Sequence, residues 1–133
     1  MSLSGVRTGL KTALASVGGL RVYDFEADAP ESPAAVVRMP DSIDPRAVLG
    51  SGWNYDIAVQ LLLSRADDRG ADGMLEDLLA ETGSTSIVAA LRTDPTLGGA
   101  CMSADVTLVD SFGVIPVGSV PMLSCRLIVE VLT

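Results

Sequence analysis

The sequence predicts an α+β fold, in which helices pack on one face of a mainly antiparallel sheet that includes a long C-terminal hairpin. Residues 3–17 and 68–82 carry apolar side chains at helical spacing, whereas residues 53–63 alternate between apolar and polar side chains, as a half-buried strand does. Two apolar stretches meet at Gly118 and Ser119, which is typical of a hairpin. Strands and helices do not alternate regularly enough for a doubly wound parallel sheet.

The N-terminal segment is predicted to form a helix, an extended stretch and an acidic loop. The apolar side chains at helical spacing in residues 3–17 are Val6, Leu10, Leu14 and Val17. Gly18 and Gly19 follow them and supply the left-handed residue at which many helices end. Residues 20–23 are predicted to be extended. The segment from there to Pro33 is rich in carboxylates and prolines, which predicts a surface loop.

The middle of the chain predicts two strands joined by a loop. Residues 35–39 are expected to form a short apolar strand, and the prolines and glycines in residues 40–52 predict a loop. Residues 53–63 give the clearest strand because one face is apolar throughout; its members are Trp53, Tyr55, Ile57, Val59, Leu61 and Leu63. We expect Trp53 and Tyr55 to lie in the core rather than on an aromatic binding surface.

Two helices are predicted next. The buried stripe of the helix over residues 68–82 is Met74, Leu75, Leu78 and Leu79. Gly83 is expected to end this helix, and Ser84 to cap a short helix that holds Ile87, Val88 and Leu91. Asp67 and Asp68 stand where the longer helix begins, so we interpret them as carboxylates favoured by the helix dipole rather than as a catalytic acid pair.

Residues 102–132 are predicted to form a hairpin that turns at Gly118 and Ser119. Counting outward from that turn places three pairs on the core face: Val106 opposite Val131, Leu108 opposite Val129, and Phe112 opposite Cys125. The same register sets Asp110 opposite Leu127, an exception that indicates a bulge or a shifted register. Cys101 falls outside this ladder, so we expect two buried, reduced thiols and no disulfide.

Composition excludes several classes of function. The chain has 133 residues, which predicts a single domain over 1–133. Nine Lys and Arg against 17 Asp and Glu give a net charge of −8 with no basic stripe, so autonomous nucleic-acid binding is not expected. The absence of histidine removes Ser-His-Asp and Cys-His pairs and His-ligated metals. We therefore expect neither enzymatic activity nor a cofactor, and no stretch is long enough to span a membrane.

Two local patterns each allow both a structural and a functional interpretation. Asp24, Glu26 and Asp28 alternate, so in an extended chain their carboxylates would share one side and could bind a divalent cation, although the glycine and distal glutamate of a calcium loop are missing. A solvated acidic loop is the favoured interpretation, and a carboxylate-based metal-binding module is the alternative. Leu62 and Ile128 are apolar on strand faces that are otherwise polar, which is a weak indication of an interface.

Residues 84–99 read STSIVAALRTDPTLGG, a short helix followed by the turn Asp-Pro-Thr-Leu-Gly-Gly that leads into a strand. The strand at residues 53–57, the Leu-rich helix around residues 74–79 and the closing hairpin accompany this turn in a fixed order. With this turn and this order of elements, the chain resembles the small tail-terminator and neck proteins of long-tailed phages and related prophage elements. The resemblance covers most of the chain.

The resemblance implies a non-enzymatic virion structural protein, whose α+β subunits form a ring, usually a hexamer, that caps the tail tube and joins it to the head connector. A head-closure or other head–tail connector protein is the alternative. The implied partners are further copies of the chain, the tail tube protein and head–tail connector proteins. DNA would pass through the lumen without specific binding, and the acid excess fits this because negative walls repel phosphate. The implied location is the tail or neck of the virion, after assembly in the host cytoplasm.

Two long polar loops are the candidate interface or lumen segments. Residues 24–35 and 40–52 are long for loops of a compact domain, so we expect them to contact neighbouring subunits or adjacent rings. Acidic residues are concentrated in the first loop, which makes it the leading candidate for an acidic lumen lining, with a solvated outer rim as an equal alternative. The candidate residues are Asp24, Glu26, Asp28, Glu31, Asp41, Asp44 and Arg46.

Overall fold

The computed structural model describes residues 3–24, 32–44, 54–64, 68–118 and 120–132. The elements within them are α1 (Leu3–Ala15), β1 (Arg21–Tyr23), β2 (Ala34–Asp44), β3 (Asn54–Ser64), α2 (Asp68–Leu78), α3 (Ile87–Thr93), β4 (Ser103–Val117) and β5 (Val120–Leu132). The strands form one sheet in the order β1-β2-β3-β5-β4, in which β1 is parallel to β2 and all other neighbours are antiparallel. The predicted α+β class with a C-terminal hairpin is confirmed.

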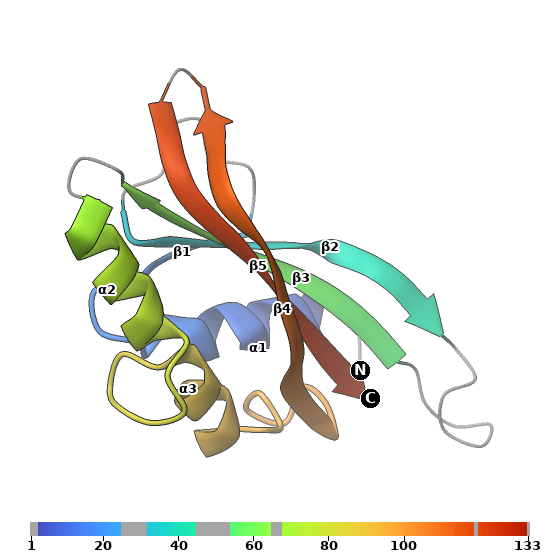
Figure 1. Cartoon of the computed structure of the whole chain (residues 1–133). Coiled ribbons are helices and arrows are strands. Elements are labelled where there is room, and N and C mark those ends of the chain that lie inside the picture. The colour runs from blue at the N-terminus through green and yellow to red at the C-terminus, as the bar shows by residue number, and fades with distance from the viewer. Residues whose placement is uncertain (1–2, 25–31, 45–53, 65–67, 119, 133) are drawn as a thin grey trace.

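The helices pack on one face of this sheet (Figure 1). Side chains of all three helices join one apolar cluster with every second residue of the central strands, as the alternation in β3 predicts. The sheet contributes Ala35, Val37, Tyr55, Ile57, Val59, Leu61, Leu63, Cys125, Leu127, Val129 and Val131 to this cluster. The predicted helix stripe of Val6, Leu10, Leu14 and Val17 is buried against them. Trp53 lies outside the described residues.

Gly9 lets α1 approach the turn that precedes β4. A Cβ atom at Gly9 would lie 2.8 Å from the carbonyl oxygen of Leu97 and 3.3 Å from the Cβ of Ala100. Leu97 itself has φ of 51° and is buried, and the Asp94 carboxylate accepts a hydrogen bond from the backbone N–H of Gly98 at 3.1 Å. The turn that carries the family resemblance is therefore a packing element of the core.

β2 is longer than predicted. The loop expected over residues 40–52 is wrong for residues 40–44, which continue the strand and pair with β3. Pro40 is accommodated because the register shifts on either side of it, and because β1 pairs with β2 only as far as Val36. A residue without an N–H group is tolerated in a strand at such an irregularity or edge.

α2 ends at Leu78 rather than at residue 82, and its predicted stripe is only partly correct. Leu75 and Leu78 are buried and Leu79 is half-buried, whereas Met74 is 41% exposed. The N-cap of α3 is Ser86 and not Ser84: its hydroxyl accepts from the backbone N–H of Ala89 at 3.1 Å and donates to the carbonyl of Ala80. This second bond ties the end of α2 to the start of α3, which the helical period alone does not reveal.

The hairpin turns where the sequence predicts, but its register shifts twice. Val117 pairs with Val120 at the tip, and the predicted register holds as far as Gly113. Shifts between Asp110 and Gly113 and between Val106 and Leu108 move the preceding residues of β4 out of the predicted pairs. Asp110 consequently pairs with Arg126, so the predicted irregularity is confirmed. Leu108 and Phe112, expected in the core, are 52% and 59% exposed. Ser111 has φ of 59° within the irregularity between Asp110 and Gly113, as bulges often require.

The other face of the sheet carries a smaller apolar cluster near the hairpin. Its buried members are Ala34, Val36, Leu62 and Met122, with Tyr23, Ile115 and Val117 packed against them. Leu62 and Ile128, interpreted from the sequence as exposed apolar residues, are 4% and 9% exposed. They therefore do not form an exposed apolar interface in the isolated subunit.

Candidate interaction surface

The helix-free face of the sheet is crossed by a row of hydrogen-bonded polar side chains. Arg38 on β2 donates to Gln60 on β3, which in turn donates to the Ser124 hydroxyl on β5 at 3.2 Å. Farther along β5, Arg126 donates from Nε and Nη2 to the two oxygens of Asp110 on β4, at 2.9 and 2.8 Å. These bonds join the side chains of four strands on one face.

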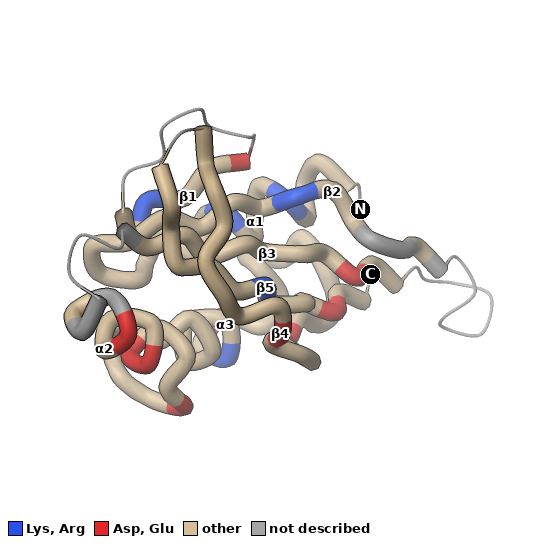
Figure 2. Tube along the Cα trace, turned by 45° about the horizontal axis from the view of Figure 1, so that its top comes forward, with Lys and Arg blue, Asp and Glu red and all other residues tan. Residues whose placement is uncertain are grey.

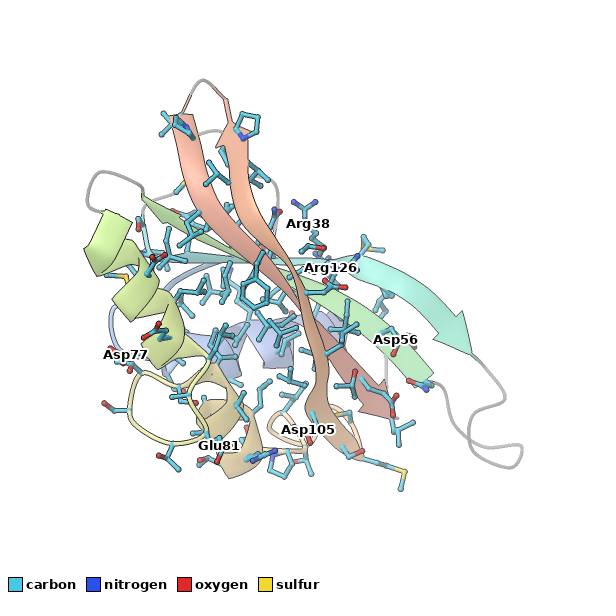
Figure 3. The ribbon with its side chains drawn as sticks, in the orientation of Figure 1. Arg38, Asp56, Asp77, Glu81, Asp105 and Arg126 are labelled. Atoms are coloured by element: carbon cyan, nitrogen blue, oxygen red, sulfur yellow. The ribbon has the colours of Figure 1, made fainter. Side chains whose placement is uncertain are left out.

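A shallow groove of about 330 Å³ lies over this row. Arg38 and Arg126 both line it (Figure 3). Hydrogen bonds from Arg126, opposed by partial burial, hold the pKa of Asp110 below its usual value. Burial, together with the charge of Asp110, raises the pKa of Cys125 to about 11. A thiol of that pKa is protonated at neutral pH, and the side chains beside it in the groove are joined by hydrogen bonds.

Acidic side chains occupy the far end of the same face. Glu130 on β5 is the register partner of both Asp56 on β3 and Asp105 on β4. Asp105 also lies 3.9 Å from the Nε atom of Arg92, with both side chains exposed. In the part of the chain that the structure describes, no three His, Cys, Asp or Glu side chains are placed to hold a metal ion together.

Several exposed apolar side chains belong to the arm, by which we mean the described residues 112–118 and 120–123 at the hairpin end of β4 and β5. The upper parts of both strands rise beyond the rest of the sheet (Figure 1), and they show no charged residue in Figure 2. β3 ends at Ser64, opposite Met122, so the last pairs of the arm have no third strand beside them. The exposed apolar side chains of the arm include Phe112 at 59%, Val114 at 45% and Val120 at 55%.

The predicted loop residues are placed only in part. Asp24 is exposed: its carboxylate lies 3.8 Å from the Lys11 ammonium, and its backbone carbonyl accepts from Arg7 at 2.8 Å. The backbones of Asp41 and Asp44 belong to β2. Glu26, Asp28, Glu31 and Arg46 lie outside the described residues, as do the side chains of Asp41 and Asp44. Their role in an interface or lumen stays a prediction.

Sequence reasoning missed the arm because it assigned Phe112 to the core. A simple signal was present: residues 111–125 contain no charged side chain, the longest such run in the chain. A solvated hairpin normally carries charges or polar groups along its exposed side. In this chain the uncharged run centred on a hairpin turn therefore predicts exposed apolar side chains better than a single apolar residue such as Leu62 does.

Comparison with known proteins finds no family model and no curated protein that matches the chain. Among the described helices, none combines the length and hydropathy that crossing a bilayer requires.

Proposed function

We propose that this protein is a non-enzymatic structural subunit of a phage or prophage tail, a tail terminator that assembles into a ring, caps the tail tube and joins it to the head connector. The observation that carries the proposal is the arm, which is apolar, uncharged and exposed at three of its side chains in the isolated subunit. Such a surface is typical of a protein that functions by binding other subunits.

Assembly would proceed by surface complementarity. A cyclic interface uses two different patches of each subunit, and it closes into a ring when the rotation between neighbours divides a full turn. One side of the closed ring would bind the last ring of the tail tube and stop its growth. The acid excess of the chain supports passage of DNA, because a negatively charged lumen does not pair with phosphates.

The titratable groups of the described residues support a structural role over catalysis. Burial raises the pKa of both thiols, Cys101 and Cys125, with the nearby charges of Asp94 and Asp110 adding to the effect. The carboxyl of Asp110, whose pKa is lowered, already accepts hydrogen bonds from Arg126. A head-closure or other head–tail connector protein is the second candidate, since it would use the same uncharged arm to bind neighbours.

Native mass spectrometry and negative-stain microscopy of the purified chain test the proposal. A ring of about six copies of the 13.7 kDa subunit, with a central opening, is the expected particle. Rings that bind the ends of tail tubes assembled from the same phage's tube protein would identify a terminator, whereas rings that bind the head connector alone would identify a connector protein. A chain that remains monomeric at high concentration and binds neither structure would refute both.

A further inference from the structure

The helix-free face of the sheet carries an exposed apolar residue between two groups of charged side chains. Leu108 on β4, Ile128 on β5 and Ala58 on β3 are register partners, so they form one line across three strands, which we call the central line. Ile128 and Ala58 are buried, whereas Leu108 is 52% exposed. An apolar centre between polar margins is the usual anatomy of an interface between proteins.

An acidic row lies on one side of the central line. Glu130 on β5 is the register partner of both Asp56 on β3 and Asp105 on β4, so three carboxylates stand side by side on adjacent strands. Like charges directly opposite each other in a sheet are destabilising. Arg92 lies 3.9 Å from Asp105 at one end of the row. A positive partner for the row would therefore relieve a repulsion that the isolated subunit contains.

A positive group lies on the other side of the central line. Arg126 and Gln60 are register partners two residues along β5 and β3 from that line, and Arg38 on β2 donates to Gln60. Asp110 is the one carboxylate among the described side chains of this group, so the two arginines leave it positive. Figure 3 shows Arg38 and Arg126 close together, with Asp56 away from both.

A two-fold axis along the central line brings the opposite charges together. Half a turn about this line lays the helix-free face of a second copy on the first and exchanges the two sides of the line. Arg126 then faces Glu130 of the second copy, because both residues lie on β5 at equal distances from the axis. Arg38 faces Asp56 of the second copy in the same way. Each pair forms twice, and Leu108 meets Leu108 of the second copy at the axis.

One pair in this arrangement is unfavourable. Asp110 faces Asp105 of the second copy, since both lie on β4 on opposite sides of the central line. Each of these carboxylates has an arginine of its own subunit beside it, Arg126 at 2.8 Å from Asp110 and Arg92 at 3.9 Å from Asp105. Attractive pairs therefore outnumber repulsive ones, and the repulsive one gives the arrangement a specific signature.

We propose that the helix-free face is a self-association surface, on which two copies of this chain pair about a two-fold axis through Leu108 and Ile128. A two-fold contact closes on two copies, so the inference goes beyond the proposed ring and does not depend on it. Two sheets can pack face to face in this aligned manner. The end of the arm lies far from the axis, because Val120 is about 27 Å along β5 from Ile128.

Self-crosslinking of a single introduced cysteine tests the axis. A residue meets its own counterpart only near a two-fold axis, so Leu108→Cys chains should form a disulfide-linked dimer on mild oxidation. Val120→Cys is the matched control, because Val120 is similarly exposed, at 55%, but lies far from the axis. The parent chain, whose thiols Cys101 and Cys125 are buried, should not crosslink. Circular dichroism verifies that each variant remains folded.

Two neutralising substitutions in the acidic row test the arrangement of charges. Glu130 faces Arg126, so Glu130→Gln should weaken dimerisation on the order of 10-fold, because the lost pair occurs twice. Asp105 faces Asp110, so Asp105→Asn should strengthen dimerisation by about 2- to 5-fold. Each substitution removes one negative charge from the same row, so an effect of net charge alone would strengthen dimerisation in both variants. Sedimentation equilibrium measures the dimer dissociation constants.

The outcomes separate this inference from the proposed function. Leu108→Cys chains that crosslink no more than Val120→Cys chains would overturn the pairing, whether or not rings form. Shifts of the same sign for Glu130→Gln and Asp105→Asn would also overturn it, as would a parent chain that stays monomeric at every concentration. Self-crosslinking at Leu108 together with shifts of opposite sign, in a chain that forms no ring, would support the pairing and reject the terminator.

Discussion

The two faces of the sheet differ in what covers them. On the helix side, residues such as Ile57, Leu61 and Leu127 are completely buried among side chains of α1, α2 and α3. On the opposite side, polar side chains bond to one another across the strands, and the arm exposes Phe112 and Val120. The comparison teaches that apolar residues of this chain occur in two settings: on one face they stabilise the subunit, and in the arm they remain exposed to solvent.

The largest expected effect tests the helix-covered face. Leu127→Ala removes a fully buried side chain at the centre of the sheet, so it should lower the free energy of unfolding by about 3 kcal/mol. Val120→Ala in the arm should change it by less than about 0.5 kcal/mol in the monomer, because that side chain has few neighbours to lose. Urea denaturation measures both, and equal losses would contradict the division of roles between face and arm.

The link between α2 and α3 should give the next largest effect. Ser86→Ala removes the N-cap of α3, whose hydroxyl is buried, and leaves the carbonyl of the half-buried Ala80 without this donor, so we expect a loss of about 2 kcal/mol. Ser84→Ala is the matched control at the position that the sequence suggests for the cap. It is exposed, and its midpoint in urea should match that of the parent. A larger loss at Ser84 than at Ser86 would reverse the assignment of the cap.

Features that depend on residues close together in the sequence could be predicted from it, whereas features that depend on contacts with distant strands could not. The helix stripe of α1 and the alternation of β3 depend on local period, and both predictions are confirmed. Local sequence predicts that a loop begins at Pro40, because neither the neighbouring strand nor the register shifts beside Pro40 can be recognised from it. The register counted from the turn predicts Phe112 opposite Cys125 in the core, but Phe112 lies within the irregularity between Asp110 and Gly113, which local sequence does not reveal. The turn at Gly118 was correct, since its glycine signal is local.

The approach of α1 to the turn before β4 should give an effect of intermediate size. Gly9→Ala would place a methyl group against the Leu97 carbonyl, at a distance that requires the backbone to shift. The gain in helix propensity offsets part of this strain, and we expect a net loss of about 1–2 kcal/mol. Gly73→Ala in α2 is the control: nothing lies within 4 Å of its new Cβ, so it should raise stability by about 0.5–1 kcal/mol. Thermal melting of the two variants should therefore show shifts of opposite sign.

The smallest expected effect concerns the ion pair at the base of the arm and appears as a pH dependence. The pKa of Asp110 is lowered in the folded chain by hydrogen bonds from Arg126, so its carboxylate stabilises the fold above its unfolded pKa of about 3.9. That stabilisation is lost as the pH falls through the lower, folded-state pKa. Asp110→Asn removes the titration, so the melting temperatures of parent and variant should differ most at pH 6 and converge toward pH 2.

The position of this pair gives the measurement a structural meaning. Asp110 and Arg126 lie next to the register shift between Asp110 and Gly113, where Ser111 adopts a positive φ and also donates to Asp110 at 3.1 Å. The pair is partly exposed, with side-chain exposures of 33% for Asp110 and 40% for Arg126, so the effect on the whole fold is small. Asp105→Asn is the control, because its carboxylate has a longer 3.9 Å contact with Arg92 and greater exposure. A parent–variant difference that stays constant from pH 6 to pH 2 would mean that the ionised carboxylate is not what holds the base of the arm, and that the backbone geometry at Ser111 alone sets its direction.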